Sequence, residues 1–121
     1  MERKLRAGSL VIDVEDRGAD GPRVVWQGKS SDRHPETVLE PFFATLVEEC
    51  AARGVSMEMR FERLHHFNSS TIGYLIKLIQ DMRARTVPLV IYFDHALLWQ
   101  KLSFEALRVF SKDKLLQIRG A

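Results

Sequence analysis

The sequence of 121 residues predicts a single α/β domain, spanning residues 1–121. In this domain a mixed, largely parallel sheet of four to five strands carries helices on one face. Three observations support the prediction. Apolar runs of strand length alternate with amphipathic segments of helical length. Strands joined by helices run mostly parallel, because a helical crossover returns the chain to the same end of the sheet. The length suits one domain, and a hydrophobic fraction of 45% is sufficient for a core.

The first two predicted strands are joined directly to each other. Residues 10–14 form a short run rich in β-branched side chains, and residues 23–28 form a second run. The intervening residues 16–22 are dense in Gly, Asp and Pro, which predicts a hairpin-like loop. Residues 29–36 are polar and are predicted to be an exposed loop.

The first predicted helix begins near Thr37, which has capping-box spacing with Glu40. Gly54 is a natural residue to end it. Its apolar positions recur at helical spacing and are Leu39, Phe42, Phe43, Leu46, Val47 and Cys50. Cys50 is the only cysteine, so it cannot form an internal disulfide, which is typical of a cytoplasmic protein. Its place on the apolar face predicts a buried, inert thiol.

The second half of the chain continues the alternation. Residues 55–61 alternate apolar and polar side chains like a half-buried strand, and the segment 61–66 is interpreted as a strand end leading into a loop. A helix is predicted at about 69–85, followed by an almost wholly apolar strand at 89–93.

The last elements are a helix and a short strand. Asp94 is a candidate cap for the helix, whose first apolar positions lie at 96–99 and which is interpreted as breaking near Ser103. Residues 115–118 are predicted to form the final strand. The predicted order is therefore β-β-α-β-α-β-α-β.

The central helix, at about 69–85, carries the features that bear on function. Asn68 is a good N-cap, because its side-chain oxygen can accept from free backbone donors of the first turn. Three hydroxyls follow it in a row, on Ser69, Ser70 and Thr71. Behind them an apolar stripe predicts a buried face, made of Ile72, Leu75, Ile76, Ile79 and Met82. The sequence thus places hydroxyls at the positive end of a buried helix, where a phosphate is well tolerated.

This segment resembles the phosphorylation-site signature of STAS domains, the anti-sigma factor antagonist family. The family pattern is Asp-Ser-Ser-Gly-Leu between a strand and an amphipathic helix, and this chain has Asn68-Ser69-Ser70-Thr71-Ile72. The strand at 89–93 fits the family as well. The pattern of elements resembles the family from about residue 9 to 118, whereas the residues themselves resemble it only in the 60–100 segment.

The resemblance implies a non-catalytic, phospho-regulated partner-switching protein that acts in signal transduction and transcription regulation. Ser69 matches the phosphorylated serine, with Ser70 and Thr71 as alternate acceptors. The implied partners are a serine kinase that is also the anti-sigma factor, and a phosphatase that resets the switch. The implied partner-binding residues are His66, Phe67, Asn68, Ser69, Ser70, Thr71 and Gly73.

Two positions depart from the family pattern. Asn68 replaces the acidic residue, which it matches in shape but not in charge. Thr71 replaces the glycine and is expected to add a side chain where a partner approaches, while Gly73 restores some clearance. These changes predict a divergent branch with its own partner. A constitutive interaction module of the same fold, never phosphorylated, is the alternative.

Other functional classes have weaker signals. The net charge of +2 and the pI of 8.9 do not call for nucleic acid or a membrane as partner. The four histidines lack the spacing of known metal sites, and no motif indicates a cofactor. A triad of Ser69, His66 and Asp94 can be drawn, but no nucleophile-elbow motif accompanies it. A small enzyme or ligand-binding domain would need a pocket near Ser69 and His66. The sequence makes no prediction of oligomeric state.

Overall fold

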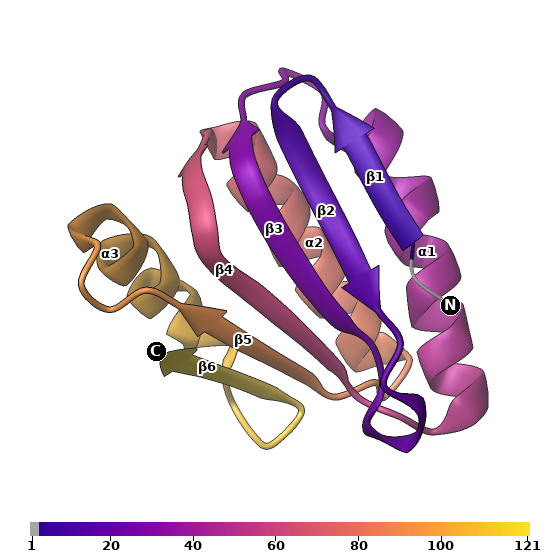
Figure 1. The fold of residues 1–121 in the computed structure, drawn as a ribbon. Coiled ribbons are helices and arrows are strands. Elements are labelled where there is room, and N and C mark those ends of the chain that lie inside the picture. Colours follow the sequence, from indigo (N-terminus) through magenta and orange to yellow (C-terminus); the bar gives the residue numbers. More distant parts are fainter. Residues whose placement is uncertain (1–2) are drawn as a thin grey trace.

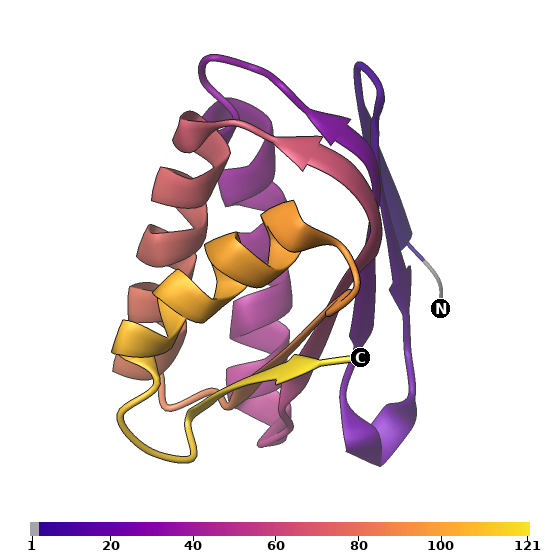
Figure 2. The same ribbon diagram turned by 90° about the vertical axis from the view of Figure 1, so that its left-hand side faces the viewer.

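A computed structural model describes residues 3–121 and confirms the α/β class (Figure 1). A six-stranded sheet has its strands in sequence order, and its helices all cover one face (Figure 2). The strands are β1 (Arg3–Ala7), β2 (Leu10–Glu15), β3 (Arg23–Ser30), β4 (Met57–Phe67), β5 (Leu89–Phe93) and β6 (Leu116–Gly120). The helices are α1 (Glu36–Arg53), α2 (Ser69–Ala84) and α3 (Leu98–Ala106), with short 3-10 turns at Gly18–Asp20 and Leu107–Phe110.

The sheet is mixed, as predicted. β1–β2 and β2–β3 pair antiparallel, whereas β3–β4, β4–β5 and β5–β6 pair parallel. The strand count exceeds the predicted four to five because β1 was not foreseen. Its sequence is rich in basic residues, and only Leu5 and Ala7 supply apolar side chains. Charged side chains are typical of edge strands, because they discourage pairing with another chain.

Helix α1 begins differently from the prediction. The N-cap position is Pro35, which makes no side-chain cap, and the predicted capping box of Thr37 and Glu40 does not form. Pro35 already has a helical φ of −63°, so the helical conformation starts before Thr37. The end of the helix is as predicted, because Gly54 adopts the left-handed conformation with φ of +66°.

β4 is longer than predicted and runs directly to the next helix. Phe61, Leu64 and Phe67 are buried at intervals of three residues, because β4 has two irregularities in its pairing with β3. The simple alternation of the sequence therefore stops at Phe61, although the strand continues. The side-chain amide of Gln100 donates to the carbonyls of Phe61 and Leu64 at 2.6 and 2.9 Å, which stabilises this bulged segment.

Helix α3 also departs from the prediction at its start. The carboxylate of Asp94 accepts a hydrogen bond from the Ala96 amide at 2.9 Å and forms a local turn rather than a helix cap. The helix begins at Leu98 and continues through Ser103 without a break.

The core lies between the sheet and the helices. Trp26 is fully buried and stacks between Phe43 and Phe61 with ring centroids 5.6 and 5.0 Å away. Cys50 is 1% exposed, which confirms the prediction of a buried thiol. Burial raises the pKa of this thiol to about 11. Among residues 3–121 no helix has both the length and the apolar character needed to cross a membrane.

Candidate functional site

The junction between β4 and α2 consists of one residue, Asn68. Its backbone is extended, with φ of −92° and ψ of 176°, and α2 begins immediately after it. The side-chain oxygen of Asn68 accepts from the Thr71 amide at 2.9 Å, which confirms the predicted N-cap. The start of α2 is therefore fixed by local sequence.

A buried relay of hydrogen bonds reinforces this cap. The Thr71 hydroxyl lies 2.8 Å from the Asn68 side-chain oxygen and 2.6 Å from the Ser30 hydroxyl. The side-chain oxygen Oδ1 of Asn68 can only accept a hydrogen bond. The Thr71 hydroxyl therefore donates its single hydrogen to Oδ1. The Ser30 hydroxyl then donates to Thr71. This relay joins the end of β3 to the first turn of α2.

Asn68 also anchors the loop that follows β3. Its amide nitrogen Nδ2 donates to the carbonyl of Asp32 at 2.8 Å, and its backbone amide donates to the carbonyl of Ser30 at 3.0 Å. The side chain of Asn68 thus uses both its oxygen and its nitrogen. An aspartate could accept the cap bonds but could not donate to Asp32. The asparagine that stands at position 68 in place of an aspartate therefore has a structural role, because only its amide nitrogen can hold the loop at Asp32.

The three hydroxyls of the first turn differ in accessibility. Ser69 is exposed and Ser70 is half-buried, whereas Thr71 is 0% exposed. Ser69 is therefore accessible from outside in the folded domain. Burial and the relay with Ser30 disfavour Thr71 as an alternate acceptor. The Thr71 side chain also points away from the surface, contrary to the expectation that it would stand where a partner approaches.

The other predicted contact residues divide in the same way. His66 and Gly73 are exposed and Asn68 is half-buried. Phe67 is 6% exposed and packs edge-on against Trp99, with ring centroids 5.2 Å apart. The accessible part of the predicted docking face is therefore His66, Asn68, Ser69, Ser70 and Gly73, and the buried residues support it from beneath. Sequence reasoning missed the supporting roles of Ser30 and Trp99, which lie far from this turn in the chain.

The electrostatics of the turn suit an added anion. The first turn of α2 contains no acidic side chain. The amides of Ser69 and Ser70 precede the first helical hydrogen bond, so they have no acceptor within the helix. These donors and the positive end of the helix dipole favour negative charge at this position.

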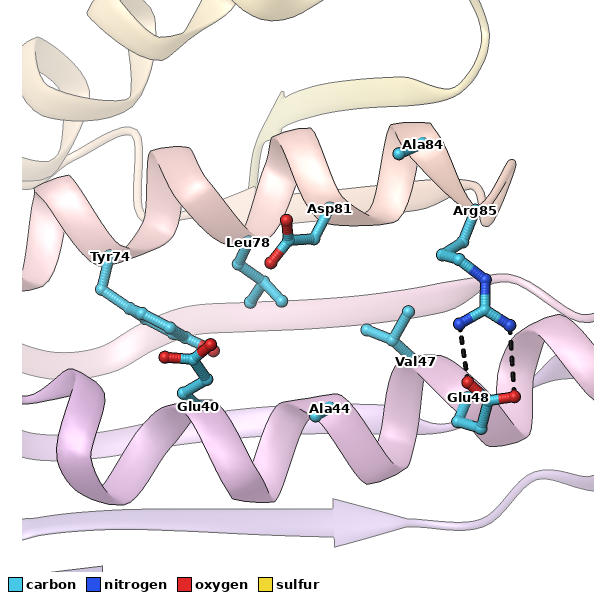
Figure 3. A pocket seen from close by; sticks show the side chains of 9 residues that line it. All are labelled: Glu40, Ala44, Val47, Glu48, Tyr74, Leu78, Asp81, Ala84 and Arg85. Atoms are coloured by element: carbon cyan, nitrogen blue, oxygen red, sulfur yellow. Dashed lines mark hydrogen bonds and ion pairs between the residues drawn. The ribbon is translucent and has the colours of Figure 1, made fainter.

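A groove of about 320 Å³ lies between α1 and α2, further along α2 (Figure 3). Its sides are lined by Ala44, Val47, Leu78 and Ala84, with Tyr74, Glu40, Glu48, Asp81 and Arg85 around them. Glu48 and Arg85 close one end with two hydrogen bonds of 2.6 and 3.2 Å, as Figure 3 shows. Burial raises the pKa of the Tyr74 hydroxyl, which donates to the Leu39 carbonyl at 3.3 Å.

The groove does not provide the pocket that an enzymatic interpretation requires. Neither Ser69 nor His66 lines it, and neither lines the two hollows on the open face of the sheet. The third member of the conceivable triad, Asp94, uses its carboxylate in the turn before α3. Within residues 3–121 no group of three or more His, Cys, Asp or Glu side chains has an arrangement that could hold a metal ion.

Solved structures resemble this one, among them three that match over most of both chains. The anti-sigma factor antagonist SpoIIAA in its unphosphorylated form has a TM-score of 0.57 at 15% identity, over 91% of this chain and 88% of that chain. The Bacillus cell fate determinant SpoIIAA in its phosphorylated form has a TM-score of 0.58 at 13% identity, over 89% and 90%. The third is the activator SiaC, from the complex of the Pseudomonas aeruginosa diguanylate cyclase SiaD with this activator. It has a TM-score of 0.66 at 15% identity, over 98% and 99%.

These likenesses define the class of the molecule by its fold. The chain is a STAS-fold domain, and the similarity extends over nearly its whole length and nearly the whole of each matched chain. No protein-family profile matches the sequence. No curated protein matches it either. The assignment of the fold therefore depends on three-dimensional similarity, which is retained when identity has fallen to 13–15%.

Proposed function

We propose that this chain is a non-catalytic partner-switching protein whose docking face is the Ser69 turn and whose switch is phosphorylation of Ser69. One observation carries the proposal. Ser69 is exposed at the N-terminus of α2, while Asn68 and Thr71 beneath it are held by hydrogen bonds that are partly or fully buried. A phosphoryl group added there would change the surface without unfolding the domain.

The physical effect of phosphorylation at this position follows from charge and size. A phosphoserine adds about −1.5 to −2 charges and three acceptor oxygens. The free first-turn amides can accommodate these oxygens, so the phosphorylated domain stays folded. A partner that covers the Ser69 hydroxyl would meet both the added bulk and the added charge. Phosphorylation would therefore release the partner.

The implied cycle has three proteins. The unphosphorylated domain binds a serine kinase that also acts as an anti-sigma factor, the kinase phosphorylates Ser69, and a phosphatase restores the hydroxyl. The domain itself supplies only the acceptor and the docking surface. The likeness to both an unphosphorylated and a phosphorylated form of SpoIIAA supports this proposal.

The acceptor is tested by intact-mass analysis with peptide mapping of the protein purified from its native cells. We expect an adduct of about 80 Da, one phosphoryl group, on the peptide that contains Ser69. A Ser69→Ala variant should lose the adduct, whereas a Ser70→Ala variant should keep it. An adduct that survives in Ser69→Ala would assign the acceptor elsewhere.

The blocking mechanism is tested by partner capture with three forms of the protein. Wild type and Ser69→Ala should capture the same kinase, and Ser69→Asp should lose it. Thr45→Asp is a matched control, because it adds the same charge at an exposed position of α1. Equal capture by Ser69→Asp and wild type would show that charge at this turn does not control binding.

A constitutive interaction module is the second candidate, and the likeness to SiaC favours it. SiaC is an activator found in complex with an enzyme, a diguanylate cyclase. On this alternative the partner of the present chain is an enzyme, and binding is insensitive to a kinase and ATP. A stable co-purifying enzyme, together with no phosphoryl adduct under any growth condition, would favour this candidate over the switch.

A further inference from the structure

The pairing of β3 with β4 contains two bulges near the end that leads to α2. Val25 pairs with Arg60 and Gln27 with Arg63, so β4 contains one extra residue between these pairs. A second extra residue follows, because Gly28 pairs with Leu64 and Lys29 with His66. Each bulge leaves two consecutive residues out of the core, first Glu62-Arg63 and then His65-His66.

These bulges gather basic side chains on the open face of the sheet. Leu10 and Ile12 face the helices, so their neighbour Val11 faces the opposite side. Val11 pairs with Arg6 on one side and with Gln27 on the other, and Gln27 pairs with Arg63. Neighbouring strands are about 4.8 Å apart, so Arg6 and Arg63 are separated by roughly 14 Å.

The next position along the strands adds more basic groups. Lys29 and His66 pair beside this row, and His65 is exposed next to them. The basic patch is defined as Arg6, Lys29, Arg63, His65 and His66. It lies where β1 and β3 end and β2 begins, at the upper edge of the sheet in Figure 1.

The three permanently charged side chains of the basic patch have no carboxylate partner among residues 3–121. Within residues 3–121, the side chains of Arg6, Lys29 and Arg63 make no hydrogen bond or ion pair. Two carboxylates on the same face are already paired. Asp13 accepts from Gln27 at 2.5 Å and lies 3.4 Å from Lys4, and Glu62 accepts from Arg60 at 3.2 Å.

The lower half of the same face is different. There Glu58 accepts hydrogen bonds from Arg23 and Arg60 at 2.6 and 3.0 Å, and Glu15 lies 3.5 Å from Arg23. Positive and negative groups alternate across neighbouring strands and neutralise one another. On the part of this face that β1–β4 form, the unpaired positive charge of the described residues therefore lies at one end, over an area about three strand spacings wide.

Arg63 also borders two hollows in the open face. One hollow, of about 230 Å³, is lined by Arg63 together with Asp13, Val14, Glu15, Val25 and Gln27. The second, of about 310 Å³, is lined by Arg63 together with Glu15, Arg23, Val25, Arg60 and Glu62, and the carboxylates in both linings are those already paired with other groups. Arg63 therefore lies beside both hollows, within reach of a ligand on this part of the face. The guanidinium of Arg63 can bind a carboxylate through two hydrogen bonds at once.

We propose that the basic patch binds a short acidic segment of a protein partner. Its three unpaired cations and two histidines complement two to four carboxylates in an extended chain. A duplex nucleic acid or a membrane surface would extend beyond the basic patch over Asp13, Glu15, Glu58 and Glu62, whose charges are already paired and add no attraction for an anion. A segment of a few residues avoids them, and so the limited size of the patch selects the class of ligand.

His66 belongs to both the basic patch and the docking face, so a partner that covers the docking face can also place an acidic segment on the basic patch. The existence of this partner rests on the proposed function. Binding of the acidic segment does not depend on phosphorylation, because the patch lies on the sheet face and not in the first turn of α2. The two proposals can therefore be tested separately.

The test is an NMR titration of ¹⁵N-labelled protein with the peptide Gly-Ser-Glu-Glu-Asp-Glu-Ser-Gly. We expect shifts concentrated at Arg6, Lys29, Arg63 and His66. A Lys29→Glu/Arg63→Glu variant should bind this peptide roughly tenfold more weakly, because two attractive charges become repulsive. Higher salt should weaken the binding to the wild type as well.

A matched control has the same change of charge elsewhere. Lys112→Glu/Lys114→Glu reverses two exposed lysines in the loop before β6 and should bind the peptide like wild type. Equal weakening in both variants would mean that net charge rather than the patch attracts the peptide. A peptide with Gln in place of each acid should not bind.

Three further results would overturn the inference: peptide-induced shifts outside the patch, tighter binding of an oligothymidylate, and tighter binding of phosphatidylserine vesicles. The last two would assign the patch to nucleic acid or to a membrane. The Ser69→Asp variant separates the two proposals, because it should keep peptide binding while losing the kinase. Peptide binding without any phosphorylation of Ser69 would support the patch and refute the switch.

Discussion

Replacing Thr71 by valine tests whether the buried relay holds the start of α2. Valine has nearly the same shape as threonine, so the substitution removes the hydroxyl without leaving a cavity. The Thr71 hydroxyl takes part in two short hydrogen bonds, of 2.6 Å with Ser30 and 2.8 Å with Asn68. Both Thr71 and Ser30 are buried, at 0% and 2% exposure, so water cannot replace the lost partner.

The expected magnitude follows from these contacts. Two lost hydrogen bonds cost about 1 kcal/mol each, and a buried hydroxyl of Ser30 left without an acceptor costs about 1–2 kcal/mol more. We therefore expect Thr71→Val to lower the free energy of unfolding by about 3 kcal/mol. With a urea dependence of about 1.5 kcal/mol/M, this lowers the midpoint by about 2 M. Urea denaturation followed by circular dichroism measures it.

Two further variants distinguish the relay from simple packing. Thr71→Ser keeps the hydroxyl and loses one methyl group, so it should cost only about 1 kcal/mol. The double variant Ser30→Ala/Thr71→Val removes the stranded hydroxyl and should be less destabilised than the sum of its two single variants, by about 1 kcal/mol or more. Strict additivity, or a Thr71→Val midpoint within about 0.3 M of wild type, would refute the relay.

Three other predictions concern the supporting structure. Gln100→Leu should lower the free energy of unfolding by about 3 kcal/mol or more in urea denaturation, because Gln100 is 0% exposed and three backbone groups lose their hydrogen-bond partner; a neutral result would contradict this role. Gly28→Ala should lower the free energy of unfolding by about 3 kcal/mol. Gly28 has φ of +83°, and an added Cβ would lie 1.9 Å from the Ser9 carbonyl oxygen. Gly54 has a similar φ of +66° but open space around it, so Gly54→Ala should lower the free energy of unfolding by only about 1 kcal/mol. If Gly28→Ala and Gly54→Ala lowered it equally, the contact with Ser9 could not be the cause of the Gly28→Ala effect. Burial raises the pKa of the Cys50 thiol to about 11, so little thiolate is present at pH 8. Cys50 should therefore react with a thiol reagent at pH 8 roughly a hundredfold more slowly in the native protein than in urea, and equal rates would show that the thiol is accessible.

The parts of the fold that sequence determined are those in which neighbouring residues decide the structure. Asn68 caps α2 through an amide three residues away, and Gly54 ends α1 by its own left-handed backbone. The strand at Leu89–Phe93 coincides with the predicted apolar run. Periodicity of this kind is a local property, so it can be interpreted without knowing what lies opposite.

The elements that were missed depend on distant partners. β1 is too basic to be recognised as a strand, and only its pairing with β2 makes it one. β4 continues past Phe61 because β3 pairs with it across two bulges and because Gln100, 39 residues away from Phe61, bonds to its carbonyl. The predicted start of α1 at Thr37 failed because Pro35 already had helical geometry.

The candidate site divides in the same manner. The sequence alone identified a capped helix with three hydroxyls in its first turn, and its resemblance to STAS domains indicated the fold that the structure confirms. Tertiary structure decided which hydroxyl is accessible, because Ser30, 41 residues before Thr71, draws the Thr71 side chain into the interior. It also decided where unpaired charge gathers, since strand register brings Arg6 and Arg63 to one end of the sheet. Local sequence specifies helix ends and periodicity, whereas exposure and charge pairing depend on residues that only folding brings together.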